Sequence, residues 1–355
     1  MNINEIQNDG FYIRDTHPRV KNMAFLSLSM ALKAYFETYK SMSFRFSHLK
    51  DTSVSPEDRD YYSASYIENA SEAIFHLQHF LELFIKELLE KEHKLLAIDV
   101  KKKHTLLFDL IKGNTYDESL LENERHIEFS EALERIVLLI KENRIDREKY
   151  EFIVDSNTWL KSLNTLRNRI AHRGVFILRY QALDYLFGKH VFPFLKQLLT
   201  LEGNENRFSD LKLKSPNGEV LIIDEIIKHF ESEAYNISKI ALLKELGRAC
   251  FENPTKYQFI TGDTHERRRA ELIAEEISKL EDIGEVLVCP VCQTKSLVKY
   301  HDYVETYDSN TNEYAGDVQI VYNVTCYCCS LELFSNLGVI KNMNLDLEDY
   351  FSEIP

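Results

Sequence analysis

Five of the six cysteines lie in the last quarter of this 355-residue chain, at the spacing of metal ligands. Cys289 and Cys292 form one Cys-x-x-Cys pair in "VCPVCQ", and Cys326 and Cys329 form another in "TCYCCSLEL". Two such pairs, separated by strand-like sequence, are typical of a zinc ribbon, where four thiolates surround Zn²⁺ and leave no position open for a substrate. The spacing therefore predicts one structural zinc ion.

Disulfides or free thiols are the alternative for these cysteines. The chain has no secretory signal, and disulfides are uncommon in cytoplasmic proteins, so the doubled spacing favours metal. Cys328 could replace Cys329 as a ligand only by distorting the second pair, and Cys250, alone on a predicted helix, is expected in the core. Acidic residues outnumber lysines between the two pairs. The ribbon therefore suits contact with a protein partner better than contact with nucleic acid.

A second group of residues able to do chemistry lies in "LNTLRNRIAHRGVF", residues 163–176. His172 is of the type that gives and takes protons near neutral pH. Arg167 can pair with two phosphate oxygens at once. Asn168 could orient the histidine or a phosphate. The three residues could form a catalytic site.

Helical periodicity places Arg167 at the edge of an apolar stripe, and places Asn168 and His172 together on the face away from it. The stripe consists of Trp159, Leu163, Leu166 and Ile170, widened by Leu160. A buried guanidinium without a partner is costly, so Arg167 must meet an acid or line a groove. The alternative explanation is that the cations near Gly174 complement the dipole at the end of an ordinary helix.

The elements around these residues are predicted to be helical from residue 21 to residue 202. In "SASYIENASEAIFHLQHFLELFIKELLEKE" eight apolar residues recur at three- and four-residue steps, which is typical of a long amphipathic helix. They are Ala70, Ala73, Ile74, Leu77, Leu81, Phe84, Ile85 and Leu88. Similar patterns before and after this segment predict a helical bundle.

Three further segments follow the bundle. Residues 203–283 begin with turn-rich sequence around Asn217-Gly218 and return to helix from residue 219, as a connecting segment. Residues 284–340 alternate β-branched and polar residues and form the zinc ribbon, and residues 341–355 are an acidic tail. The predicted fold class is therefore mainly α, with a small β ribbon.

The net charge of −14 opposes unspecific binding to nucleic acid, so any such contact must be local. Basic groups that could provide one are Lys101–Lys103, the arginines between Arg167 and Arg179, and Arg267–Arg269. The start of the chain is polar and charges interrupt every apolar run. We expect a cytoplasmic protein without a membrane partner.

A helical bundle whose late helix carries Arg-polar-x-x-x-His resembles the HEPN superfamily, whose ribonuclease members commonly have Asn at the polar position. Here the motif reads "RNRIAH". Glu82 and Lys86, one turn apart, and His104 in "KKKHTLLFDLI" are similar to features of these domains. The resemblance covers about residues 21–200 and makes residues 21–202 a HEPN-like bundle.

The resemblance implies a metal-independent endoribonuclease in which Arg167, Asn168 and His172 are catalytic. The substrate is RNA, because its 2′-hydroxyl serves as the nucleophile. HEPN ribonucleases pair two such helices across a homodimer, so that both copies of the motif flank one groove. The superfamily further implies a toxin or an effector of antiviral defence.

The main alternative is a non-catalytic HEPN module that binds a nucleotide, an RNA or a protein, with the ribbon as adaptor. A DNA-binding regulator would need a basic recognition surface that the sequence does not display. Gly174 stands where a tyrosine commonly follows in HEPN toxins silenced by a nucleotidyltransferase. Control by tyrosine modification is therefore not expected.

Overall fold

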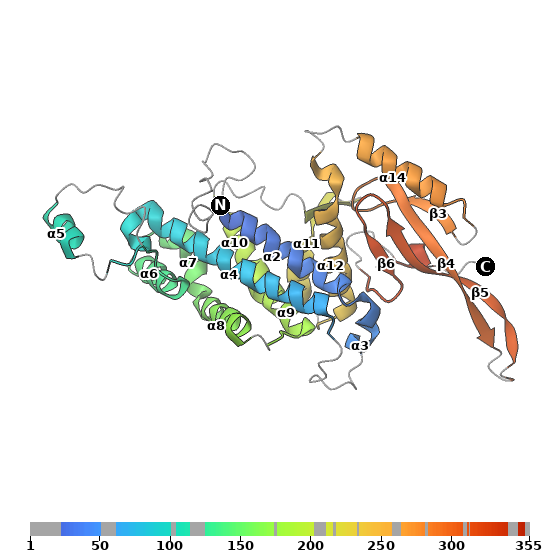
Figure 1. Cartoon of the computed structure of the whole chain (residues 1–355), viewed down its shortest axis with the longest axis horizontal. Coiled ribbons are helices and arrows are strands. Elements are labelled where there is room, and N and C mark those ends of the chain that lie inside the picture. The colour runs from blue at the N-terminus through green and yellow to red at the C-terminus, as the bar shows by residue number, and fades with distance from the viewer. Residues whose placement is uncertain are drawn as a thin grey trace, which may run out of the picture. The chain divides into compact units, whose positions relative to one another are not determined.

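The computed structural model describes residues 23–50, 62–100, 104–113, 125–173, 176–201, 211–215, 218–232, 234–257, 264–280, 283–307, 311, 313–339 and 347–351. The protein is mainly helical, with a small antiparallel sheet near its C-terminal end (Figure 1), which confirms the predicted fold class at this level. Lys101–Lys103, Asn217, Gly174, Asp308 and most of the acidic tail lie outside the described residues.

The helices are α2 (Met23–Lys40), α3 (Phe46–Lys50), α4 (Ala64–Glu92), α5 (His104–Lys112), α6 (Phe129–Lys141), α7 (Arg147–Asp155), α8 (Asn157–Arg173), α9 (Tyr180–Leu186), α10 (Phe192–Leu199), α11 (Ile222–Ser232), α12 (Ile237–Glu252), α14 (Thr264–Ile277) and α15 (Glu348–Phe351). The strands are β1 (Lys212–Ser215), β2 (Gly218–Leu221), β3 (Ile283–Val288), β4 (Lys295–Tyr307), β5 (Tyr314–Cys326) and β6 (Glu332–Phe334). No helix within these residues combines the length and the apolar character that crossing a bilayer requires.

The chain divides into two compact units, and each is described by itself. The first contains Met1–Leu32 and Ser71–Phe176, and the second contains Lys33–Ala70 and Ile177–Pro355. Helices α2 and α4 contribute residues to both. The boundaries predicted at residues 202, 283 and 340 remain a prediction.

The long helix α4 buries the whole of its predicted apolar stripe, since each of the eight residues is at most 5% exposed. In the first unit, α6 likewise buries one face, which includes Leu133, Ile136 and Ile140. Helix α8 packs against α6 and α7. The side chain of Asn164 on α8 donates to Ser130 Oγ at 2.9 Å. These contacts fix the first half of the helix that carries the predicted catalytic residues.

Helix α12 is the most completely buried element of the second unit. Every residue from Ile240 to Cys250 is buried, including the cysteine that was predicted to lie in the core. Helices α9 and α10 are joined by a π-helical turn, Phe187–Val191. Gly188 in this turn faces the ring of Phe230, because a Cβ atom at this position would lie 2.0 Å from Phe230 Cδ2. The absence of a side chain at Gly188 therefore lets the π-turn approach α11 closely.

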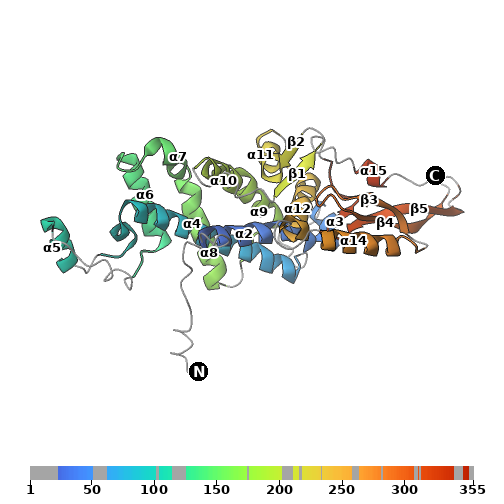
Figure 2. The same ribbon diagram turned by 90° about the horizontal axis from the view of Figure 1, so that it is seen from above.

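The four-stranded sheet has the order β3-β4-β5-β6, with every neighbouring pair antiparallel. Helix α14 lies along β3 and β4 (Figure 1). The paired strands β4 and β5 continue past the end of α14 in both views (Figure 2). The expected strands of the ribbon are therefore present.

The helix predicted from residue 219 begins only at Ile222, because residues 218–221 form β2 and pair with β1. Leu211 and Leu213 are buried whereas Lys212 between them is exposed. This two-residue alternation is the pattern of a strand with one covered face.

Candidate functional site

The four predicted metal ligands converge beside the sheet. Their Sγ atoms lie within 4.8 Å of one another, and all four side chains are buried. Cys289 and Cys329 have their sulfurs 3.5 Å apart, and the sulfurs of Cys292 and Cys326 are 3.6 Å apart. A tetrahedron with metal–sulfur bonds of about 2.3 Å has sulfur–sulfur edges of about 3.8 Å. The four residues are therefore positioned to hold a metal ion of this size.

The two Cys-x-x-Cys pairs repeat one backbone geometry. In the first, the N–H of Val291 donates to Cys289 Sγ at 3.4 Å, and in the second the N–H of Cys328 donates to Cys326 Sγ at 3.4 Å. The residue after each pair has a positive φ, 59° at Gln293 and 56° at Ser330. Each pair thus forms the same tight turn and presents its two sulfurs to one point.

This repetition also explains why Cys328 is not a ligand. Cys328 takes the place that Val291 has in the first turn, where the residue offers its backbone N–H to a ligand sulfur. Its own Sγ lies 3.7 Å from Thr294 Oγ1, outside the cluster of four. The structure therefore places the sulfur of Cys329, and not that of Cys328, in the cluster of four that could hold a metal ion.

A bound cation would stabilise the thiolate form of these buried sulfurs. Burial raises the pKa of the Cys289 thiol well above its ordinary value. Thiolates are the form that binds metal, and a divalent cation stabilises them in a buried site. Metal binding by this cluster therefore releases protons and is favoured at neutral over acidic pH.

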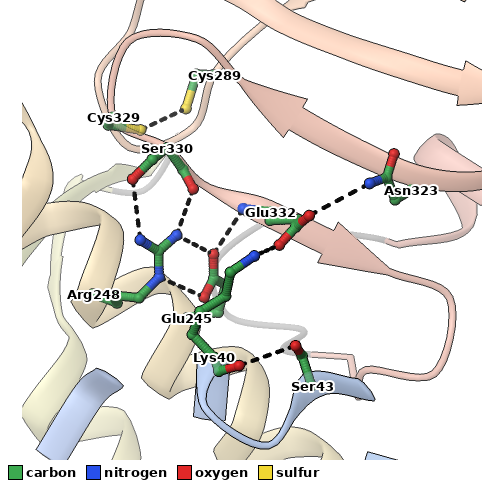
Figure 3. A network of polar contacts seen from close by, with 9 residues as sticks. All are labelled: Lys40, Ser43, Glu245, Arg248, Cys289, Asn323, Cys329, Ser330 and Glu332. Carbon is green, nitrogen blue, oxygen red and sulfur yellow. Dashed lines mark hydrogen bonds and ion pairs between the residues drawn. The ribbon is translucent and has the colours of Figure 1, made fainter. Parts of the chain in front are cut away.

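A buried arginine holds the second turn to helix α12 (Figure 3). The Arg248 guanidinium forms a two-bond pair with Glu245, with Nε to Oε2 at 2.9 Å and Nη2 to Oε1 at 2.6 Å. It also donates through Nη1 to Ser330 Oγ at 3.0 Å and through Nη2 to the carbonyl oxygen of Ser330. Glu245 accepts the N–H of Glu332 at 2.7 Å, and Glu332 pairs with Lys40. The residue that follows Cys329 is thus bonded directly to the helical core.

A second buried ion pair lies in the same unit, between Lys244 on α12 and Asp184 on α9, both with fully buried side chains. Tyr35 donates to Asp184 Oδ1 at 3.3 Å, and Tyr235 donates to Oδ2 at 2.7 Å. The Lys244 ammonium lies 3.8 Å from the centre of the Tyr180 ring. Burial raises the pKa of Asp184 and lowers the pKa of Lys244, while each charge opposes the effect on the other.

Neither buried pair was foreseen from the sequence. The available signal was "ISKIALLKELGRACFE", in which Lys244, Glu245 and Arg248 stand among apolar residues on every side. A helix that is apolar all round is buried, so charges within it require partners. The partners, Asp184 and Ser330, are distant in sequence and could not be identified from the pattern.

Helix α8 ends at Arg173, as predicted, and its two halves differ in burial. Leu160 and Leu163 in the first half are buried within the first unit. From Thr165 to His172 no residue is buried, although Leu166 and Ile170 continue the apolar stripe. The second half of the predicted stripe is therefore only partly covered.

The three predicted catalytic residues lie in this open half. Asn168 is half-buried and His172 is exposed. Arg167 is half-buried and donates from Nη1 to Asn168 Oδ1 at 3.0 Å, but it forms no ion pair within the part of the chain that the structure describes. Arg169 on another face lies 6.0 Å from the centre of the Phe176 ring. Of the two alternatives predicted for Arg167, an acid partner is not found among the described residues, and the observed partner is the amide of Asn168.

The structure also describes Glu82, Lys86 and His104, which were predicted to be similar to features of HEPN domains. Lys86 Nζ lies 2.6 Å from Glu82 Oε1, and Gln78 donates to the other carboxylate oxygen at 3.1 Å. His104 is the first residue of α5. Comparison with known proteins adds no assignment for these residues, since no protein-family model matches the chain and no curated protein or solved structure is significantly similar to it.

Proposed function

We propose that this protein is a metal-independent endoribonuclease of the HEPN type, in which Arg167, Asn168 and His172 act on RNA. The observation that supports the proposal best is the half-buried Arg167, which forms no ion pair among the described residues. Partly desolvated arginines ordinarily meet a carboxylate, because leaving the charge uncompensated is costly. A guanidinium oriented by a neighbouring amide, on the same helix as an exposed histidine, suits a phosphate ligand.

In the proposed reaction the RNA supplies the nucleophile. The imidazole of one His172 takes the proton of a 2′-hydroxyl as its oxygen bonds to phosphorus, and the bond to the 5′-oxygen breaks. The partner's His172 begins as the imidazolium and gives its proton to the departing oxygen. The products are a 2′,3′-cyclic phosphate and a 5′-hydroxyl. Arg167 stabilises the additional negative charge on the phosphorane-like transition state.

A homodimer is part of this proposal, because one α8 supplies one His172. The second half of α8 supports such a contact, since Leu166 and Ile170 are apolar and only half-buried. Covering them with the same helix of a second copy would remove apolar surface from water. The placing of both copies of Arg167 and His172 at one groove follows from the HEPN resemblance, because His172 lies on the face of α8 away from Leu166 and Ile170.

The proposed metal at the four cysteines is zinc, with a structural role. Four sulfur donors suit Zn²⁺ and leave no coordination position for a substrate. The ribbon would then serve folding and protein contact. The proposed biological role, a toxin or an effector of antiviral defence, follows from the HEPN resemblance alone.

The test is to incubate purified protein with total RNA in a buffer that contains EDTA, beside His172→Ala, Arg167→Ala and Asn168→Ala variants. Cleavage by the wild type with 2′,3′-cyclic phosphate ends is expected. Loss of one general acid–base or one transition-state cation should slow cleavage by about 100-fold or more. Metal content and circular dichroism establish that each protein is folded in the assay.

Arg169→Ala is the matched control, because it removes one arginine from the same helix without removing the guanidinium beside Asn168. This variant should lose far less activity than Arg167→Ala, because Arg169 could contribute to RNA binding but not to the charge beside Asn168. Cleavage that survives in His172→Ala would overturn the assignment. RNA binding without cleavage by a folded dimer would instead support the alternative function, a non-catalytic HEPN module.

A further inference from the structure

Strands β4 and β5 extend beyond the sheet as a two-stranded ribbon. The pairing of β3 with β4 ends at Tyr300, and β6 pairs with β5 only from Asn323 to Thr325. Among the described strands, residues 302–307 and 314–320 pair only with each other, and we call them the arm. In Figures 1 and 2 the arm continues past α14. Two-stranded ribbons of this kind are marginally stable in water unless something covers them.

One face of the arm combines aromatic and acidic side chains. Tyr303, Tyr307 and Tyr314 are each more than half exposed, at 56%, 55% and 58%. Glu305 and Asp317 stand directly opposite each other between these rings. Like charges at opposed positions destabilise a pair of strands. A cationic surface placed against this face would stabilise both the strand pairing and the exposed rings.

The same unit carries a surface of the opposite character on the first half of α14. A hollow of about 670 Å³ is lined, among the described residues, by His265, Arg268, Arg269, Leu272 and Ile273. Leu272 is 53% exposed and Ile273 is 36% exposed. Cations here surround an apolar floor. Tyrosine rings and carboxylates are the groups that such a surface would bind.

The charges of the two surfaces lack partners of opposite charge within the part of the chain that the structure describes. Among the described residues, Glu305 and Asp317 form no ion pair with a cation, and Arg268 and Arg269 form none with an acid. Glu305 accepts a bond from Tyr307 at 2.7 Å instead. No arm residue is among the described residues that line this hollow.

We propose that the arm of one copy docks into the α14 hollow of a second copy. The arm's carboxylates then meet Arg268 and Arg269, while its tyrosines cover Leu272 and Ile273. A two-fold arrangement would make this contact twice, arm to hollow and hollow to arm. The contact lies in a different unit from α8. It goes beyond the proposed ribonuclease function and does not depend on it.

Sedimentation velocity of four proteins at low and high salt tests the proposal. The variants are Glu305→Arg/Asp317→Arg in the arm, Arg268→Glu/Arg269→Glu in the hollow, and the combination of all four changes. Each double variant should weaken the association step by at least about 10-fold, and high salt should weaken it in the wild type. The combined variant should recover association, because the reversed charges pair again.

Glu92→Arg/Glu142→Arg is the matched control for charge. It changes the net charge as much as the arm variant does, at exposed helix ends where a cation is favourable. This variant should associate like the wild type. Association through other surfaces should be the same in the wild type and in every variant. Only the contact between arm and hollow should respond to the charge reversal.

Hydrogen exchange locates the contact. Amides in the arm and in residues 265–273 should be protected in the wild type at high concentration, and this protection should be lost in both double variants. No arm-dependent association of the wild type up to about 100 µM would overturn the proposal. A loss in the arm variant without a loss in the hollow variant would place the arm against another surface of the second copy and equally refute docking into the α14 hollow.

Discussion

The buried pair of Lys244 and Asp184 predicts that two single substitutions will change stability with opposite dependence on pH. Asp184→Asn removes the negative charge and leaves a fully buried ammonium beside two tyrosine rings. Lys244→Met removes the positive charge and leaves a fully buried carboxylate. Breaking a buried ion pair on one side typically costs about 3–5 kcal/mol. This is a large part of the 5–15 kcal/mol that ordinarily stabilises a protein.

The two costs are not equal, because the remaining groups differ in their partners. After Lys244→Met, the carboxylate keeps the hydroxyl donors of Tyr35 at 3.3 Å and Tyr235 at 2.7 Å. After Asp184→Asn, the ammonium keeps two ring faces and one amide oxygen. We therefore expect Lys244→Met to cost less, near the lower end of that range, and Asp184→Asn to cost more at neutral pH.

The pH dependence follows from the directions of the pKa shifts. Burial raises the pKa of Asp184, and removing Lys244 removes the group that opposes this rise. The folded Lys244→Met variant then binds more protons than the unfolded chain, so its stability falls as the pH rises above about 4, by up to about 1.4 kcal/mol per unit. Burial lowers the pKa of Lys244. The Asp184→Asn variant therefore gains stability as the pH rises toward about 10.

The assay is urea unfolding followed by circular dichroism between pH 5 and pH 9.5, with every variant compared to the wild type at the same pH. The difference curves should slope in opposite directions. A double variant, Lys244→Met/Asp184→Leu, should be flat with pH and close to the wild type in stability, since an apolar pair can replace a buried ion pair. Parallel curves for the two single variants would refute the reasoning.

Two further predictions concern the metal centre and the π-turn. The wild type and Cys328→Ser should each hold one metal ion per chain by mass spectrometry, whereas Cys292→Ser and Cys329→Ser should lose it, because Cys328 is outside the cluster of four; metal retained by Cys329→Ser would contradict this ligand set. Gly188→Ala should cost about 1–3 kcal/mol and lower the melting temperature by several degrees, since its Cβ would lie 2.0 Å from Phe230 Cδ2. Phe230→Leu in the same chain should recover part of the loss, and an unchanged melting temperature for Gly188→Ala would show that the approach of the two helices is not as close as described.

Local pattern was sufficient for the elements that bury one face. The apolar stripe of α4 could be predicted from the sequence because an amphipathic helix repeats its apolar residues at a fixed period. All eight predicted positions are buried. The four metal ligands were readable because each pair forms a local turn whose geometry depends on spacing alone. The end of α8 at Arg173 could be predicted from the glycine that follows it in the sequence.

Features that depend on distant partners were not readable. The hairpin of β1 and β2 was missed because its strands are four residues each, too short for a periodic signal to stand out from the turn residues around them. Asp184 and Lys244 are sixty positions apart, and only the packing of α9 on α12 identifies them as a pair. The hydrogen bonds of Arg248 likewise join α12 to the turn that contains Cys329. The sequence of α12 alone does not indicate this contact.

The bond between Arg248 and Ser330 has a consequence for where this chain can be divided. The turn that contains Cys326 and Cys329 is hydrogen-bonded to α12. Arg248 donates to the carbonyl oxygen of Ser330, and Glu245 accepts from the backbone N–H of Glu332. A chain shortened before β3 would therefore expose a buried arginine and a buried carboxylate as well as lose a ribbon. If the four cysteines hold a metal ion as proposed, loss of that ion would also loosen the turn that closes α12, and metal supply would then affect the lifetime of the folded helical core.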